Sequence, residues 1–438
     1  MPLLQESIQE STKEAHKIQP GLLASYRKAQ ERGLKLNMAR GKPSPEQLDL
    51  SSGMLNALGP DELVGACHAG QADDRRNYGD LLGIPEARAL MAAIMEVPPD
   101  SVIVANNSSL SIMYDLVSRA MTHGLAGEAP WARLPEGERP VFVCPAPGYD
   151  RHFAATAHFG IEMITVAMRD DGPDMDHVES LVESKEHGRR VKGIWCVPKY
   201  SNPTGVTYSE EVVRRLAALK SPARDFRIYW DNAYAVHDLG EQGDTLFSIK
   251  QACDEAGNPD RWYQLASTSK ITFAGAGIAA VASSPANIDE IARQLAMRTI
   301  GPDKLNQLRH VMFLRDLKGV RAHMRRHAEL LRPKFETVLR VLAEELGGQG
   351  LGEWTRPNGG YFISFDGPVG TARRVVELCA DAGVVLTAAG ATYPGGVDPH
   401  DKNIRIAPTY PSVEELEQAS CLFALCVKIA AAEKAARL

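Results

Sequence analysis

Short apolar runs recur along the chain and alternate with longer stretches of mixed polarity. The runs are rich in β-branched and aromatic residues, and each is bounded by proline, glycine or charged residues: 102–104, 141–143, 163–166, 194–197, 228–230 and 278–281. Such runs are typical of strands, and the stretches between them are long enough for helices. Because apolar and polar positions do not alternate strictly within the runs, they fit strands buried on both faces of a largely parallel sheet. The pattern therefore predicts an α/β fold.

The segments between these runs indicate helices and connections. Residues 4–32 predict a mostly polar helix, and residues 112–117 predict an apolar one. Residues 125–140 contain three prolines and predict a long connection. A basic helical run, residues 321–327, follows Gly319 and marks the expected start of a smaller C-terminal domain. The sequence contains no internal repeat and no low-complexity tract.

Composition and charge narrow the class of protein. The chain has 438 residues, of which 44% are hydrophobic, so it can bury a large core and form two domains. A formal net charge of -6 argues against nucleic-acid binding, which needs concentrated positive charge. Seven cysteines form no CxxC pair and are odd in number, so we expect no metal site, no disulfide framework and a cytoplasmic location. Residues 1–24 carry charged and amide side chains throughout, so we expect no signal peptide and no membrane segment.

The strongest chemical candidate is Lys270, in the tetrapeptide Ser267-Thr268-Ser269-Lys270. Serine hydroxyls can hold a phosphate, and a lysine amine beside them can form a Schiff base with a carbonyl cofactor. The motif alone is weak, because lysines in solvated loops are common. Asn202 and Asp231 each follow an apolar run, as Lys270 follows residues 263–266, and the carboxyl ends of parallel strands meet at one sheet edge. We therefore expect these side chains to converge.

Several motifs in a fixed order support a family resemblance. Asn202-Pro203-Thr204-Gly205, Asp231-Asn232-Ala233-Tyr234, Lys270 and Arg405 resemble the pattern of fold-type I pyridoxal-phosphate (PLP) aminotransferases of class I/II. Four further runs resemble the type Ic aspartate aminotransferase subgroup: 39–49, 107–110, 147–153 and 300–307. The resemblance covers almost the whole chain. It implies a large PLP-binding domain, residues 53–319, with a mostly parallel mixed sheet flanked by helices, and a smaller α/β domain from residues 1–52 and 320–438.

The resemblance also implies catalytic roles. Lys270 would hold PLP as a Schiff base and, once freed, move a proton from the substrate. Asp231 would keep the ring nitrogen of PLP protonated, because a nearby carboxylate favours the charged form. Asn202 and Tyr234 would hydrogen-bond the phenolic oxygen of PLP, and Tyr149 would stack an aromatic ring on the cofactor face.

Three regions are candidates for binding the cofactor phosphate. Ser108, Ser109 and Leu110 precede or open an apolar helix, where hydroxyls and backbone amides meet the positive end of a helix dipole. Ser267 adds a hydroxyl from the lysine loop. In relatives, Tyr78 would reach the phosphate of the other subunit. The sequence departs from the commoner family pattern, because no arginine lies about eight residues after Lys270, and Lys304 is a candidate to replace it.

Arginines would select the substrate. By resemblance, Arg405 would clamp the substrate α-carboxylate, a task that suits its planar fork of donors, with Asn202 beside it. A dicarboxylate also needs a cation for its distal carboxylate. Arg298 lies near the position that carries one in aspartate-specific relatives. Arg40 and Lys42 are rivals, because they flank Gly41 in a loop expected to fold over the site.

We therefore predict a cytoplasmic homodimer that transfers the amino group of an L-amino acid, aspartate by resemblance, to 2-oxoglutarate by a ping-pong route. Alternatives are an aminotransferase for alanine or aromatic amino acids and a PLP-dependent β-lyase or decarboxylase, because bond orientation cannot be read from sequence. A PLP-sensing transcription regulator would need a basic helix-turn-helix domain before the fold, and the 40 residues before Gly41 are too few for one.

Overall fold

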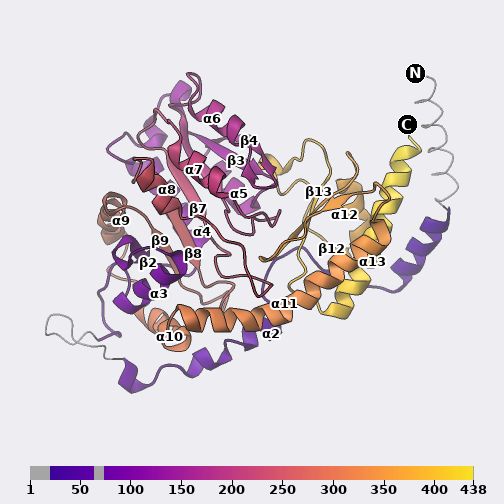
Figure 1. The fold of residues 1–438 in the computed structure, drawn as a ribbon, viewed down its shortest axis with the longest axis horizontal. Coiled ribbons are helices and arrows are strands. Elements are labelled where there is room, and N and C mark those ends of the chain that lie inside the picture. The colour runs from indigo at the N-terminus through magenta and orange to yellow at the C-terminus, as the bar shows by residue number, and fades with distance from the viewer. Residues whose placement is uncertain (1–19, 64–73, 438) are drawn as a thin grey trace.

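The computed structural model describes residues 20–63 and 74–437 (Figure 1). Eight strands form one sheet in the order β2-β9-β8-β7-β6-β3-β4-β5. Their bounds are β2 Val102–Val104, β3 Val141–Ala146, β4 Glu162–Arg169, β5 Gly172–Pro173, β6 Val191–Cys196, β7 Arg227–Asp231, β8 Trp262–Ser267 and β9 Ala279–Ala282. The pairings that join β4, β3, β6, β7 and β8 are parallel, and those of β9 and β5 are antiparallel. The predicted α/β fold with a mostly parallel sheet is confirmed.

Each of the six apolar runs lies in a strand, to within one residue of its ends. Successive residues of the central strands face opposite sides, as the pleat requires. In β7, Ile228 and Trp230 belong to one hydrophobic core and Tyr229 to another. The sheet is therefore buried on both faces, which explains why its strands do not alternate between apolar and polar residues.

Helices cover both faces of the sheet (Figure 1). The core that contains Tyr229 is completed by α4 (Ser109–His123) and α9 (Pro285–Arg298). The opposite core receives side chains from α3 (Pro85–Met95), α6 (Met175–Val182), α7 (Glu210–Ala218) and α8 (Ile249–Glu255). Further helices are α5 (Asp150–His158), directly after β3, and α10 (Lys304–Leu314). The predicted connection at 125–140 contains two short 3-10 turns, η4 (Trp131–Arg133) and η5 (Glu136–Glu138).

A third core lies beside the large sheet. It is formed by the second half of α11 (Leu317–Leu346), by α12 (Ala372–Asp381) and α13 (Val413–Ala435), and by helical residues 20–31. Strands β10 (Glu353–Trp354), β11 (Ile363–Asp366) and β13 (Asn403–Ile406) make a small antiparallel sheet against it, and β1 (Leu36–Asn37) pairs with β12 (Val384–Val385).

Helix α11 joins this third core to the large sheet (Figure 1). Its Val320 and Met324 pack in a core of the sheet, whereas Leu331 and Leu346 pack in the third core. The boundary predicted after Gly319 therefore falls inside one continuous helix. The composition change there marks the start of α11 and not a flexible linker, and the division into two domains stays a prediction.

Some predictions fall partly outside the described residues. The predicted helix at 4–32 is helical over 20–31, and its earlier residues are not among those described. Cys67 also lies outside them, and the other six cysteines form no disulfide within the described chain. Among the helices of residues 20–63 and 74–437, none is long and apolar enough to cross a membrane.

Candidate active site

The site lies where the carboxyl ends of the parallel strands meet. Lys270 follows β8, Asp231 ends β7, Asn202 follows β6 and Tyr149 follows β3. Strand β2, which leads to Ser109, has the same direction as β8 because both pair antiparallel with β9. A cavity of about 220 Å³ opens at this edge. It is lined by Arg40, Gly41, Ser109, Tyr149, Asp150, Arg151, Val197, Asn202, Asp231, Ala233, Tyr234, Lys270, Phe362 and Arg405.

Lys270 presents its amine to this cavity from a short turn after β8. The amine nitrogen lies 5.0 Å from the centre of the Tyr234 ring. Burial lowers the pKa of Lys270, and the carboxylate of Asp231 partly opposes this shift. A lower pKa increases the neutral fraction of the amine, and only the neutral amine is a nucleophile toward an aldehyde.

Asp231 is held by a residue that sequence reasoning did not single out. Its Oδ2 atom lies 3.1 Å from Nε2 of His152, whose ring stacks on Trp195 with 4.4 Å between ring centres. The other oxygen, Oδ1, is buried and has no hydrogen-bond partner within the described chain. A buried carboxylate oxygen without a donor is costly, so this atom fits a charged donor such as a protonated ring nitrogen. His152 lies in the run 147–153, which was its only sequence signal.

Arg405 comes from β13 and reaches the same cavity. Its Nη1 atom donates to Oδ1 of Asp150 at 3.0 Å and to Oδ1 of Asn202 at 3.1 Å. Its guanidinium lies over the ring of Phe362, with 4.8 Å to the ring centre, and the residue is only 7% exposed. The site therefore presents a nearly buried arginine that already accommodates one carboxylate. Asp150 and Phe362 are further site residues that the sequence reasoning missed.

The start of α4 closes one side of the cavity. The hydroxyl of Ser108 accepts a hydrogen bond from the backbone N–H of Ser111 and so caps the helix. Ser109, the first residue of α4, lines the cavity, and Leu110 packs against the core beneath. Unpaired N–H groups and the helix dipole at such an end favour an anion.

The lysine loop packs closely on the loop before α4. The hydroxyl of Ser267 donates to Oγ of Ser269 at 3.2 Å, and Ser269 donates to the backbone oxygen of Asn107 at 3.5 Å. A Cβ atom at Gly277 would lie 3.0 Å from that same oxygen and 3.3 Å from the backbone nitrogen of Ser269. Glycine at 277 therefore allows the two loops to approach. This contact brings Ser267 and Ser269 beside the helix end.

The segment 39–43 borders the cavity beside Phe362 and Arg405. Arg40 and Gly41 both line it. A Cβ atom at Gly41 would lie 2.4 Å from the tip of the Phe362 ring, so only glycine fits this approach. Lys42 instead places its amine 4.0 Å from the centre of the Tyr410 ring, and it does not line the cavity.

Arg298 is not brought to the Lys270 cavity. It pairs with Asp115, donates from Nη2 to Oδ1 of Asn106 at 3.2 Å, and lines a separate cavity of about 470 Å³. Within one chain, the cations beside Arg405 and Lys270 in the described lining are Arg40 and Arg151. A role for Arg298 at an active site would therefore need a second subunit.

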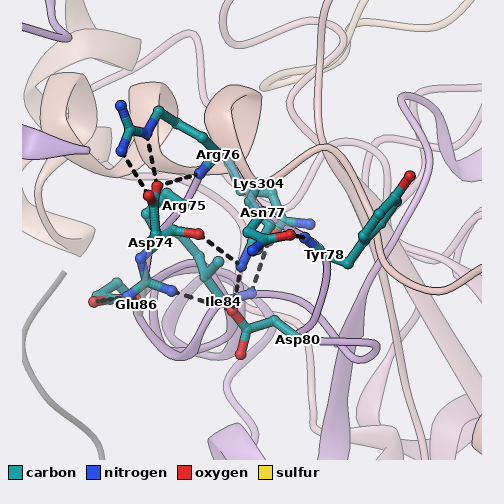
Figure 2. Close-up of polar contacts among 10 residues, drawn as sticks. Asp74, Arg75, Arg76, Asn77, Tyr78, Asp80, Ile84, Glu86 and Lys304 are labelled. Carbon is teal, nitrogen blue, oxygen red and sulfur yellow. Dashed lines mark hydrogen bonds and ion pairs between the residues drawn. The ribbon is translucent and has the colours of Figure 1, made fainter. Parts of the chain in front are cut away.

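Figure 2 shows the surroundings of Lys304 and Tyr78. The Lys304 amine lies 3.4 Å from Oδ2 of Asp80 and 3.4 Å from the backbone oxygen of Asp74, and the residue is buried. The Tyr78 side chain points away from this cluster (Figure 2) and is 78% exposed. Neither residue lines the Lys270 cavity of its own chain.

The residues of the cavity fit PLP. They include an amine with a lowered pKa, a buried carboxylate oxygen that lacks a donor, and a helix N-terminus that suits a phosphate. Burial raises the pKa of Tyr234 well above its usual value, so its phenol stays protonated and can donate a hydrogen bond. Burial also raises the pKa of Tyr149, whose ring lies beside His152 with 4.9 Å between centres.

Comparison with known proteins agrees with this geometry. A family model described as aspartate aminotransferase matches residues 10–438. An aspartate aminotransferase of Corynebacterium glutamicum is 46% identical over 92% of this chain and 91% of its own length. The crystal structure of an aspartate transaminase from that organism has a TM-score of 0.91 and 44% identity, with 97% of each chain covered.

A more distant structure shares the fold. The α-aminoadipate aminotransferase LysN of Thermus thermophilus, solved with N-(5'-phosphopyridoxyl)-L-leucine, has a TM-score of 0.73 and 22% identity over 96% of this chain and 98% of its own. Aminotransferases of this fold family use PLP. The extent of these matches and the convergence of Lys270, Asp231 and Arg405 in one cavity show that the chain is an aminotransferase and belongs to the aspartate aminotransferase family.

Proposed function

We propose that the protein binds PLP and transfers the amino group of aspartate to 2-oxoglutarate by a ping-pong route. The observation that carries the proposal is the meeting of Lys270, Asp231, Asn202 and Arg405 in one cavity of about 220 Å³. Bound PLP would supply an electron sink that weakens the bonds at the substrate α-carbon. A site of this construction binds an α-amino acid by its carboxylate and moves a proton at its α-carbon.

The chain's own residues divide this work. Lys270, with its lowered pKa, would hold the cofactor aldehyde and then carry the proton that leaves the α-carbon. The unpartnered oxygen of Asp231 would accept a hydrogen bond from the protonated ring nitrogen of PLP, while His152 holds the other oxygen. Asn202 and the protonated phenol of Tyr234 would donate to the phenolic oxygen. Arg405 would take the α-carboxylate.

The charge of the cavity supports a dicarboxylate substrate. Three arginines line it, Arg40, Arg151 and Arg405, against the two carboxylates Asp150 and Asp231. Arg40 and Arg151 make no side-chain hydrogen bond or ion pair within the described residues, so their charges are available. We propose that Arg40 binds the distal carboxylate, because Gly41 beside it holds the segment against Phe362, next to Arg405.

A donor series tests this assignment. The protein should convert aspartate with 2-oxoglutarate to oxaloacetate and glutamate, and Arg40→Gln should raise the KM for aspartate by about tenfold or more while leaving that for alanine nearly unchanged. Arg133→Gln, an exposed arginine outside the cavity, is the matched control. Equal effects of Arg40→Gln on both donors would remove Arg40 from the distal site. Faster turnover of alanine or an aromatic amino acid would retain the transaminase and replace the substrate.

We further propose a homodimer in which Tyr78 and the Arg298 loop serve the neighbouring site. The support is the 78% exposure of Tyr78 and the position of both residues away from their own Lys270 cavity. Chains that carry Lys270→Ala can be co-expressed with chains that carry Tyr78→Ala, and the mixed dimer isolated through two tags. A site with normal activity should form if Tyr78 acts across the interface. An inactive mixed dimer would place Tyr78 in its own site, and an active monomer would overturn the dimer.

A further inference from the structure

Two buried histidines that do not line the cavity contact the turn that carries Lys270. Nε2 of His237 lies 3.3 Å from the backbone oxygen of Lys270, and Nε2 of His323 lies 2.8 Å from that of Ile271. Both histidines are less than a tenth exposed. A carbonyl oxygen only accepts, so each Nε2 must carry the proton. These two backbone oxygens lie in a turn, where no helix or strand supplies a hydrogen bond. Because buried backbone oxygens need donors, the imidazole N–H groups take that role.

His327 and Gln47 extend this contact toward the segment that carries Arg40 and Gly41. His327, one turn after His323 on α11, places its Nε2 3.1 Å from Nε2 of His323. Its Nδ1 lies 3.0 Å from Nε2 of Gln47, which is fully buried. The amide of Gln47 has a fixed orientation, because its oxygen accepts from the backbone N–H of Ser44 at 3.1 Å. Gln47 is therefore the donor, and His327 carries its proton on Nε2. Because Nε2 of His323 is also protonated, the two rings do not hydrogen-bond each other, and His327 instead shares the backbone oxygen of Ile271 with His323.

Gln47 donates hydrogen bonds to two residues, His327 and Tyr361, that each connect it to Lys270. It lies on α2 (Pro45–Asp49), directly after the segment that carries Arg40 and Gly41. Its amide also donates to the hydroxyl of Tyr361 at 3.0 Å. The Lys270 amine lies 5.8 Å from the centre of the Tyr361 ring. The segment that lines the cavity is thus joined to the backbone of the Lys270 turn through His327 and to the Lys270 side chain through Tyr361.

We propose that Gln47 and His327 are positioning residues, which set the place of the Lys270 amine relative to the segment that lines the substrate side of the cavity. Only the expected change in kcat rests on the proposed function, whereas the positioning of the Lys270 turn does not. The described residues hold no group of three or more side chains suited to bind a metal, so the histidine cluster is explained by its hydrogen bonds. Burial lowers the pKa of His323 and His327, in agreement with neutral rings.

The test uses Gln47→Leu and His327→Leu, which remove the donor or the acceptor, and His327→Gln, which keeps an acceptor for Gln47 and a donor beyond it. Tyr26→Phe is the matched control. It removes a buried hydrogen bond of 2.7 Å, to the backbone oxygen of Leu378, in the same core but away from Lys270. All variants are compared with the wild type in cofactor-free and PLP-loaded form.

In the cofactor-free protein, hydrogen exchange of the peptide 267–273 should be faster in both leucine variants and unchanged in Tyr26→Phe. In the PLP-loaded protein, the pH at which the visible absorption band changes should shift in the same two variants. Their kcat should fall about tenfold or more with little change in KM, because small displacements of a reacting group are costly. His327→Gln should restore most of each property.

Two results would overturn the inference. One is normal exchange, absorption and kcat in both leucine variants, and the other is a change of the same size in Tyr26→Phe, which would mean a general loss of stability. If a leucine variant does not fold, Gln47→Asn, whose side chain is one methylene shorter, replaces it: exchange of the peptide 267–273 should be faster in Gln47→Asn than in His327→Gln, and equal exchange at the wild-type rate would overturn the inference. Failure of wild-type turnover would instead count against the proposed function, and the exchange result would still test the positioning.

Discussion

Lowering the pH from about 8 to about 5 should destabilise the protein through His310. This residue of α10 is fully buried. Its Nδ1 donates to the backbone oxygen of Asn306 at 2.7 Å, and its Nε2 lies 3.1 Å and 2.9 Å from the hydroxyls of Thr268 and Thr272. Nε2 must therefore accept from a hydroxyl, and a proton placed on it would end that acceptance and leave a charged ring buried beside the turn that carries Lys270.

The size of the effect follows from the pKa of His310. Burial is the main reason that this pKa is lowered from 6.5 to about 4. Between these values the unfolded chain binds more protons than the folded one. The free energy of unfolding is therefore undiminished by His310 above about pH 6.5 and falls as the pH falls below it. At about 1.4 kcal/mol for each tenfold difference in proton affinity, the loss is about 2 kcal/mol at about pH 5 and roughly 3 kcal/mol below about pH 4.

The assay is denaturant unfolding of the cofactor-free protein at both pH values, followed by circular dichroism. His310→Gln removes the titrating group but still offers an oxygen to the threonine hydroxyls. The free energy of unfolding of the wild type should drop by about 2 kcal/mol more than that of His310→Gln. His158→Gln, at an exposed histidine, should behave as the wild type does. An equal pH dependence in wild type and His310→Gln would refute the reasoning.

Three further changes have definite expected results. Lys270→Ala should abolish the visible band of the Schiff base between PLP and Lys270 and most of the turnover, measured by spectrum and coupled assay, and retained turnover would contradict the mechanism. Lys192→Met should cost roughly 3 kcal/mol in thermal or denaturant unfolding, because it removes the charged partner, 2.7 Å away, of the buried carboxylate of Asp225 and leaves that carboxylate only the N–H of Trp131. Gly41→Ala should raise the KM for aspartate while stability changes little, because the new methyl would displace the segment from Phe362; an unchanged KM would mean that the segment does not shape the site.

Much of the fold could be predicted from local pattern. Strands such as β2 and β7 were found because runs of β-branched and aromatic residues are buried on both faces. The continuity of α11 across Gly319 could not be predicted, because glycine and a change in composition also occur at linkers. Only the packing of Val320 against one core and of Leu331 against another shows that the helix links them.

The candidate site was predictable where residues follow strands, as Asp231 and Lys270 do. Contacts between side chains far apart in the sequence were not. His152 meets Asp231 across 79 positions, and Asp150 meets Arg405 across 255. No local pattern encodes such pairs: the first depends on how α5 packs at the end of β7, and the second on how the small sheet packs against the large one.

The most direct test of the central claim is a single half-reaction. The PLP-loaded protein is mixed with aspartate and no oxoacid, and the visible absorption and the products are measured together. The account predicts loss of the visible band and one molecule of oxaloacetate for each occupied site, with the band restored by 2-oxoglutarate. A band that persists, or a release of carbon dioxide or ammonia in place of oxaloacetate, would contradict it.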